Sequence, residues 1–180
     1  GTAGTAVSAV VTAKDAYDNT VVGYTGTVAF TSDATVKTHP GNYTFVAGDN
    51  GTHTFTNAMT IFTTGTWYVR AQDTVDSVKQ GQQSNIDIQF ASLDHFDVTG
   101  ISDPLIAGTP QSVTVTAKDI YNNNVVGYVG TISFTSDDGA ATLPSNYTFV
   151  AGDSGVRTFA SGITLKTTGD KYVRVTDQAD

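Results

Sequence analysis

Aspartate and asparagine side chains gather in one turn of each half of the sequence, directly after an alternating run of apolar residues. Ca²⁺ takes about 6 to 8 oxygen ligands of this kind, so both turns are candidate calcium sites. The candidates are Asp15, Asp18, Asn19, Asp119, Asn122 and Asn123. No D-x-D-x-D-G loop with a closing Glu is present, which excludes an EF-hand. The alternative, that these side chains fix the turns by accepting backbone N–H bonds, is favoured.

Catalytic chemistry finds little support in the residue types. The chain has no cysteine, and none of its histidines, His39, His53 and His95, has a counterpart in the other half. A Ser-His-Asp or histidine–metal site would need partners that no spacing indicates. We therefore expect no enzymatic activity, no catalytic residue, and no cofactor beyond the candidate calcium.

Three asparagines lie in N-x-T sequons, which accept N-linked glycan where the machinery exists. These glycosylation candidates are Asn42, Asn50 and Asn146. The simpler interpretation, a turn Asn followed by strand residues, is favoured at the first and last of them.

An aromatic group and two lysines complete the candidate chemistry. Phe62, Trp67 and Tyr68 could stack on a sugar ring, but lysines replace Phe62 and Trp67 in the other half, which favours partly exposed strand residues. Lys14 and Lys118 are placed for an isopeptide bond only if they point inward, and the strand alternation points them outward.

The octapeptide NYTFVAGD occurs at residues 42–49 and again at residues 146–153. A shift of 104 residues aligns residues 1–76 with residues 105–180 without a gap, and more than half of the pairs are identical. The chain is a tandem duplication. We expect two domains, residues 1–90 and 91–180, with the first lacking its first strand and the second its last.

Alternation of apolar and polar residues predicts short strands at matching places in both copies. Segments 83–90 and 93–101, outside the aligned copies, are predicted to close the first domain and open the second. The Asp-Asn-Gly and Asp-Ser-Gly sequences after NYTFVAG predict tight hairpins. Seven short strands in about 100 residues are typical of an immunoglobulin-like β-sandwich, and a barrel is the less favoured alternative.

The differences between the copies separate an inner from an outer face. The pairs expected inside are Val11 and Val115, Phe30 and Phe134, Phe45 and Phe149, Phe55 and Phe159, Ile61 and Leu165, and Val69 and Val173. The pairs expected outside are Thr52 and Val156, His53 and Arg157, Phe62 and Lys166, and Trp67 and Lys171.

Composition limits the kinds of partner that we expect the chain to bind. The chain has 17 acidic and 9 basic residues, every acidic one is Asp, and the net charge of -8 repels nucleic-acid phosphates. The absence of Glu favours turns over helices. No apolar run approaches the roughly 20 residues of a membrane span, so neither nucleic acid nor membrane insertion is expected.

The pieces D-x-Y-x-N, Y-T-F-x-A-x-D-x-G and T-T-G-x-x-Y-V-R, present in both copies, resemble the bacterial immunoglobulin-like repeats of large secreted and surface-anchored proteins, to which invasin and intimin stalks are more distantly related. The resemblance implies an extracellular or cell-surface β-sandwich used as a spacer or adhesive stalk, without a catalytic site. Its partners would be neighbouring repeats of the same array or identical subunits. The missing strands are expected from a longer array of which this sequence is a part, and the alternative is that neighbouring molecules in a filament supply them. The competing hypothesis is a carbohydrate-binding or accessory binding module of a secreted protein.

Overall fold

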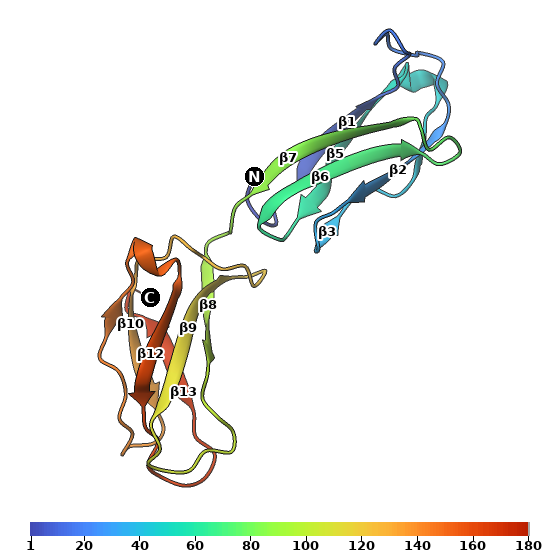
Figure 1. The fold of residues 1–180 in the computed structure, drawn as a ribbon. Coiled ribbons are helices and arrows are strands. Elements are labelled where there is room, and N and C mark those ends of the chain that lie inside the picture. The colour runs from blue at the N-terminus through green and yellow to red at the C-terminus, as the bar shows by residue number, and fades with distance from the viewer. Residues whose placement is uncertain (180) are drawn as a thin grey trace. The chain divides into compact units, whose positions relative to one another are not determined.

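The fold was analysed in a computed structural model, which describes residues 1–179 (Figure 1). The chain divides into two compact units, Gly1–Phe90 and Ala91–Asp180, each with its own sheets and core. Apart from one short 3-10 turn in each unit, the regular structure described is β. Residues 1–179 contain no helix with the length and apolar character that a membrane crossing requires.

Unit 1 holds two antiparallel sheets. One has the order β1-β5-β3 and the other the order β4-β2-β6-β7. The elements are β1 (Val7–Thr12), β2 (Thr27–Ser32), β3 (Lys37–Thr38), β4 (Tyr43–Thr44), the 3-10 turn η1 (Ala47–Asp49), β5 (Thr52–Ile61), β6 (Gly65–Asp73) and β7 (Gln80–Ile88).

Unit 2 repeats this plan with different outer strands. Its sheets have the orders β12-β9-β8 and β11-β10-β13. The elements are β8 (Leu93–Thr99), β9 (Gln111–Asp119), β10 (Thr131–Ser136), β11 (Tyr147–Thr148), the 3-10 turn η2 (Ala151–Asp153), β12 (Val156–Ile163) and β13 (Val173–Asp177).

The strand orders confirm the predicted fold class. An immunoglobulin-like sandwich divides its strands into sheets ABED and CFG. In unit 1, β1, β5 and β3 take the places of B, E and D, and β2, β6 and β7 those of C, F and G. In unit 2, β8, β9 and β12 take those of A, B and E, and β10 and β13 those of C and F. The sheets remain open and separate in the described residues, so the barrel alternative is wrong.

Both cores lie between the facing sheets, where the strand alternation directs every second side chain. Phe45 and its counterpart Phe149 are 1% exposed. In unit 1, Phe30 from β2 meets Phe55 from β5 edge to face, with ring centroids 4.7 Å apart. Phe134 and Phe159 repeat this contact at 5.0 Å. These pairs join the two sheets of each unit, as their inward prediction requires.

The turn after the repeated octapeptide differs from the predicted hairpin. β4 pairs with β2, whereas β5 pairs with β1 in the other sheet, so the chain crosses between sheets at this point. A 3-10 turn makes the crossing, and it ends at Asn50 in the left-handed region with φ 49°. Gly51 follows with φ 76°, and a Cβ there would lie 2.5 Å from the carbonyl oxygen of Val21. Glycine is needed for a close backbone crossing, not for a hairpin.

Five residues predicted to point outward are instead half-buried, namely His53, Phe62, Trp67, Val156 and Lys171. Trp67 packs against a second apolar cluster of unit 1, formed by Ala3, Ala34, Ile61 and Ile88. Its indole N–H donates to the carbonyl oxygen of Thr63 at 2.9 Å. Period-two alternation failed here because the register of β6 and β7 shifts between Trp67 and Val69.

Candidate functional site

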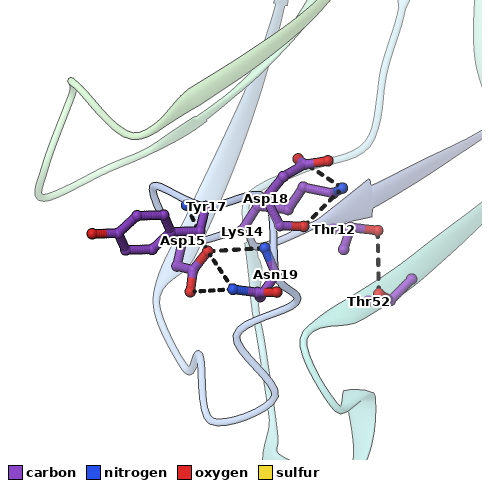
Figure 2. A network of polar contacts seen from close by, with 7 residues as sticks. All are labelled: Thr12, Lys14, Asp15, Tyr17, Asp18, Asn19 and Thr52. Carbon is purple, nitrogen blue, oxygen red and sulfur yellow. Dashed lines mark hydrogen bonds and ion pairs between the residues drawn. The ribbon is translucent and has the colours of Figure 1, made fainter.

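The first candidate turn follows β1 and is held by the Asp15 carboxylate (Figure 2). Its Oδ1 accepts the backbone N–H groups of Tyr17 and Asn19, each at 2.9 Å. The Asn19 side-chain amide donates to Oδ2 at 3.0 Å. These bonds, with the Asn19 side chain contributing most, lower the pKa of Asp15. Both carboxylate oxygens therefore already serve the turn itself.

The other charged groups of this turn pair with each other. The Lys14 ammonium lies 2.9 Å from Oδ1 of Asp18 (Figure 2), in an ion pair that is exposed on both sides. Thr12 and Thr52 connect the ends of β1 and β5 by a hydroxyl bond of 3.2 Å. Asp18 itself is in the left-handed region with φ 70°, a conformation that Asp tolerates better than most residues. The pair holds Lys14 at the rim of the turn.

In the same turn of unit 2, the aspartate carboxylate is buried. Oδ1 of Asp119 accepts the N–H groups of Tyr121 and Asn123 at 2.9 and 2.8 Å. Oδ2 accepts the Asn123 amide and the N–H of Ala91, both at 2.9 Å. Burial would raise the pKa of Asp119, but these hydrogen bonds outweigh it and the pKa is lowered. The donor that has no counterpart among the described residues of unit 1 is Ala91, two residues ahead of the start of β8.

The remaining candidate of this turn faces outward. Asn122 is exposed, has φ 64°, and its carbonyl oxygen accepts from the Lys118 ammonium at 3.2 Å. Within residues 1–179, no three side chains of His, Cys, Asp or Glu gather as a metal-ion cluster. Calcium binding through carboxylate, amide and carbonyl oxygens stays a prediction.

A tyrosine–aspartate pair ties the start of strand C to the end of strand F in each unit. The Tyr24 hydroxyl donates to Asp73, and the Tyr128 hydroxyl donates to Asp177 at 2.7 Å. Burial, together with the Asp73 carboxylate, raises the pKa of Tyr24 to about 12. The Tyr24 bond and two backbone N–H groups lower the pKa of Asp73 to about 2. Sequence reasoning missed this pair, although all four residues are identical between the copies.

A buried carboxylate in unit 2 was also missed. Asp138, only 3% exposed, accepts the backbone N–H groups of Lys166, Thr167 and Ala140. The Lys166 bond contributes most to a pKa of about 2. Its counterpart in unit 1 is Ala34, so no repeat signal could have identified it.

The acidic residue of the 3-10 turn organises a third group. Asp49 accepts from the Tyr43 hydroxyl and from the Val46 N–H, and its Oδ1 lies 3.0 Å from Nδ1 of His53. The His53 ring stacks on Tyr43 at a centroid distance of 3.9 Å. In unit 2, Arg157 takes the place of His53, 3.4 Å from Asp153. Two positions predicted to vary freely thus each place a basic side chain against the same carboxylate.

The other predicted residues are dispersed over the two units. The sequon residues Asn42, Asn50 and Asn146 are exposed, and their glycosylation stays a prediction. His39 contacts the Pro40 carbonyl oxygen, while His95 lies 2.9 Å from Asp94.

A hollow of about 500 Å³ lies at one end of unit 2, beside the segment that leads into β9. Its lining includes Leu105, Ala107, Leu165 and Lys171. The unit 1 counterparts of these residues are Gly1, Ala3, Ile61 and Trp67. In unit 1, all four lie around the Ile88 side chain at the end of β7. The hollow corresponds to the place that Ile88 fills in unit 1.

Comparison with known proteins adds no family assignment. No family model and no curated protein matches the chain. A β-glucuronidase of Parabacteroides merdae, crystallised with glycerol in its active site, is 14% identical with a TM-score of 0.35, over 86% of this chain and 20% of that one. The D0-D1 domain of intimin is 16% identical with a TM-score of 0.33, over 95% and 82%. A glycosyl hydrolase family 2 member of Bacteroides cellulosilyticus is 14% identical with a TM-score of 0.34, over 98% and 28%.

The chain spans about a fifth of the β-glucuronidase that it resembles. At these identities and TM-scores, the strand order and not the likeness defines the class. The molecule is a tandem immunoglobulin-like β-sandwich protein.

Proposed function

We propose that this chain is a structural repeat module of an extracellular stalk, adhesin or surface filament, and that it acts as a non-catalytic, semi-rigid spacer. The observation that carries the proposal is the contrast between a shared interior and an unshared surface. Phe45 and Phe149 are equally buried, and the Tyr24–Asp73 bond recurs as Tyr128–Asp177. A binding surface copied with the module would be retained in both units.

The surface lacks that repetition. Phe62 and Trp67 correspond to Lys166 and Lys171, and Trp67 uses its N–H and part of its ring within unit 1. Hydrogen bonding of the buried polar groups also supports a structural role, because in the described residues every buried side-chain nitrogen and oxygen has a partner. Exposed threonines and a net charge of -8 suit a soluble surface that does not adhere to its neighbours. The extracellular location rests on the resemblance to bacterial immunoglobulin-like repeats.

The spacer role is tested with arrays of one, two and three added 104-residue periods, measured by small-angle X-ray scattering. The maximum dimension of a semi-rigid array increases linearly with the number of periods. We expect an increase of about 30 Å or more per period, since a strand of nine residues such as β6 spans ~30 Å. Growth with the square root of the period number, as a flexible chain shows, would contradict the proposal.

A glycan array probed with the same chain examines the competing role. Specific carbohydrate binding that Trp67→Ala abolishes, while Lys171→Ala leaves it intact, would replace the spacer by a carbohydrate-binding module.

A further inference from the structure

Equivalent residues of the two units differ in burial along one strand. The inward side chains of β9 are completely buried, with Val113, Val115 and Ala117 each 0% exposed. Their counterparts on and after β1 are only half-buried. Yet β1 pairs with β5 just as β9 pairs with β12, the counterpart of β5. These counterparts are Ala9, Val11 and Ala13.

The difference continues through the turn that follows. Asp119 is 0% exposed, and Asn123, Val125 and Tyr128 are 8%, 6% and 7% exposed. In unit 1, each of the four counterparts is more exposed, and Val21 reaches 38%. The counterparts are Asp15, Asn19, Val21 and Tyr24. All four are identical in type to the unit 2 residues, so sequence does not explain the difference.

Strand β8 accounts for it. β8 pairs with the outer edge of β9, with Phe96 opposite Ala117 and Val98 opposite Val115. The Phe96 ring packs edge to face on Tyr128 at 5.3 Å. The segment before β8 gives the Ala91 N–H to the Asp119 carboxylate. Within residues 1–179, β1 pairs with β5 alone and nothing takes the place of β8 in unit 1.

We propose that the open edge of β1 binds an extended strand of the β8 type, with an aromatic and then an aliphatic residue on its inward face. The register in unit 2 places the aromatic residue of that strand opposite Ala13, beside Tyr24, and its next inward residue opposite Val11. A backbone N–H ahead of the strand completes the Asp15 carboxylate. The backbone N–H and C=O groups of an exposed edge provide the hydrogen bonds to an added strand. The spaces beside Ala13 and Val11 that receive its inward side chains determine which sequence fits.

Charge favours the same occupant. β8 brings an acidic side chain towards the neighbouring lysine, because Asp97 lies 3.7 Å from Lys118. The counterpart of Lys118 is Lys14, whose side chain is half-exposed at the rim of the open edge. The inference concerns this edge and holds whether or not the chain serves as a spacer.

The approach to the strand is already formed in unit 1. The Gly4 N–H donates to the Ile61 carbonyl, as the Gly108 N–H does to that of Leu165. The Thr5 N–H donates to the Thr2 carbonyl at 3.1 Å, as the Thr109 N–H does to that of Ile106 at 3.1 Å. The approach is thus the same in both units from Gly4 onward, whereas Gly1 and Thr2 contact Asp87 and Gln89 in a way that residues 91–179 do not repeat.

The test appends a second copy of residues 91–104 directly ahead of Gly1 in the full chain, which reproduces the spacing of unit 2 without a linker. Trp67, the single tryptophan, lies in unit 1, so its fluorescence reports the melting of that unit alone. The extension is expected to raise the Trp67-monitored melting temperature by about 5 °C or more. It is also expected to slow amide exchange at Val10 and Thr12, whose N–H groups face the open edge, whereas the Ala13 N–H already donates to the Gly51 carbonyl oxygen.

The matched control carries Phe96→Asp and Val98→Asp in the appended copy only, so that length and flexibility stay the same. Equal melting temperatures for the extension and this control would overturn the proposal, as would unchanged exchange along β1.

Discussion

At the level of single residues, carboxylates in this protein accept backbone N–H bonds at turns. The burial of each carboxylate decides how much these bonds contribute to stability. Asp15 and Asp119 make equivalent bonds to equivalent residues. Only Asp119 is fully buried and also holds Ala91. Removing an acceptor from a buried site leaves donors without partners, which costs more than removing an exposed one.

Replacing these two aspartates by alanine is therefore expected to cause unequal losses of stability. Asp119→Ala should lower the free energy of unfolding of unit 2 by about 3 kcal/mol, since several buried N–H groups lose their acceptor. Asp15→Ala should destabilise unit 1 clearly less. Urea denaturation followed by circular dichroism gives both transitions, and Trp67 fluorescence identifies that of unit 1. Equal losses in the two units would contradict this explanation.

Acid should act through Asp73. Its folded pKa of about 2 lies below the ordinary value of about 3.9, so the ionised carboxylate stabilises unit 1 at pH values above about 4. That contribution is lost as the pH falls from about 4 towards 2. Asp73→Asn keeps one acceptor oxygen without the charge. We expect it to lower the melting temperature at pH 7 and to flatten the fall between pH 4 and 2.

The control for this titration is Asp18→Asn, which changes an exposed carboxylate in the same unit. A profile for Asp73→Asn as steep as that of the unchanged chain would rule out Asp73 as the acid-sensitive group. Trp67 fluorescence supplies the melting curve at each pH.

At the level of elements, the sequence predicted strands well and their connections less well. Alternation located β2, β9 and β10, because each has one face on the core and one in solvent. It also predicted the strands β7 and β8, as the segments that close the first domain and open the second. The turn after NYTFVAG was read as a hairpin because Asp-Asn-Gly suits both a hairpin and a crossing. Only the pairing partners, which are distant in sequence, distinguish the two.

The candidate site shows the same limit. The oxygen-rich turns at Asp15 and Asp119 were identified from local composition, since all their donors except Ala91 lie within four residues of the carboxylate. The bond between Tyr128 and Asp177 joins residues 49 apart, and Asp138 bonds Lys166 at a separation of 28. Separations of this size leave no periodic signal. The prediction for Trp67 was wrong for a related reason. The register shift beside it depends on the pairing of β6 with β7, so the sequence of β6 alone does not reveal it.

At the level of the whole molecule, each unit has its own core, which predicts independent unfolding. Phe149 is 1% exposed, and Phe149→Ala should cost unit 2 about 3 to 5 kcal/mol. The Trp67-monitored transition of unit 1 should stay unchanged, while the circular dichroism transition of unit 2 moves to lower temperature. The matched variant Phe45→Ala should do the reverse. A shift of both transitions by either variant would mean that the units unfold together.

The open edge of β1 also affects how the protein behaves as a colloid. Val7 and Val10 are 51% and 63% exposed on that strand, and an unpaired edge with apolar side chains is a template for association. At neutral pH, the negative charge keeps molecules apart. The sequence isoelectric point of about 4.5 marks where that repulsion vanishes. Solutions should therefore turn cloudy near pH 4.5, at an acidity where both sandwiches are still folded.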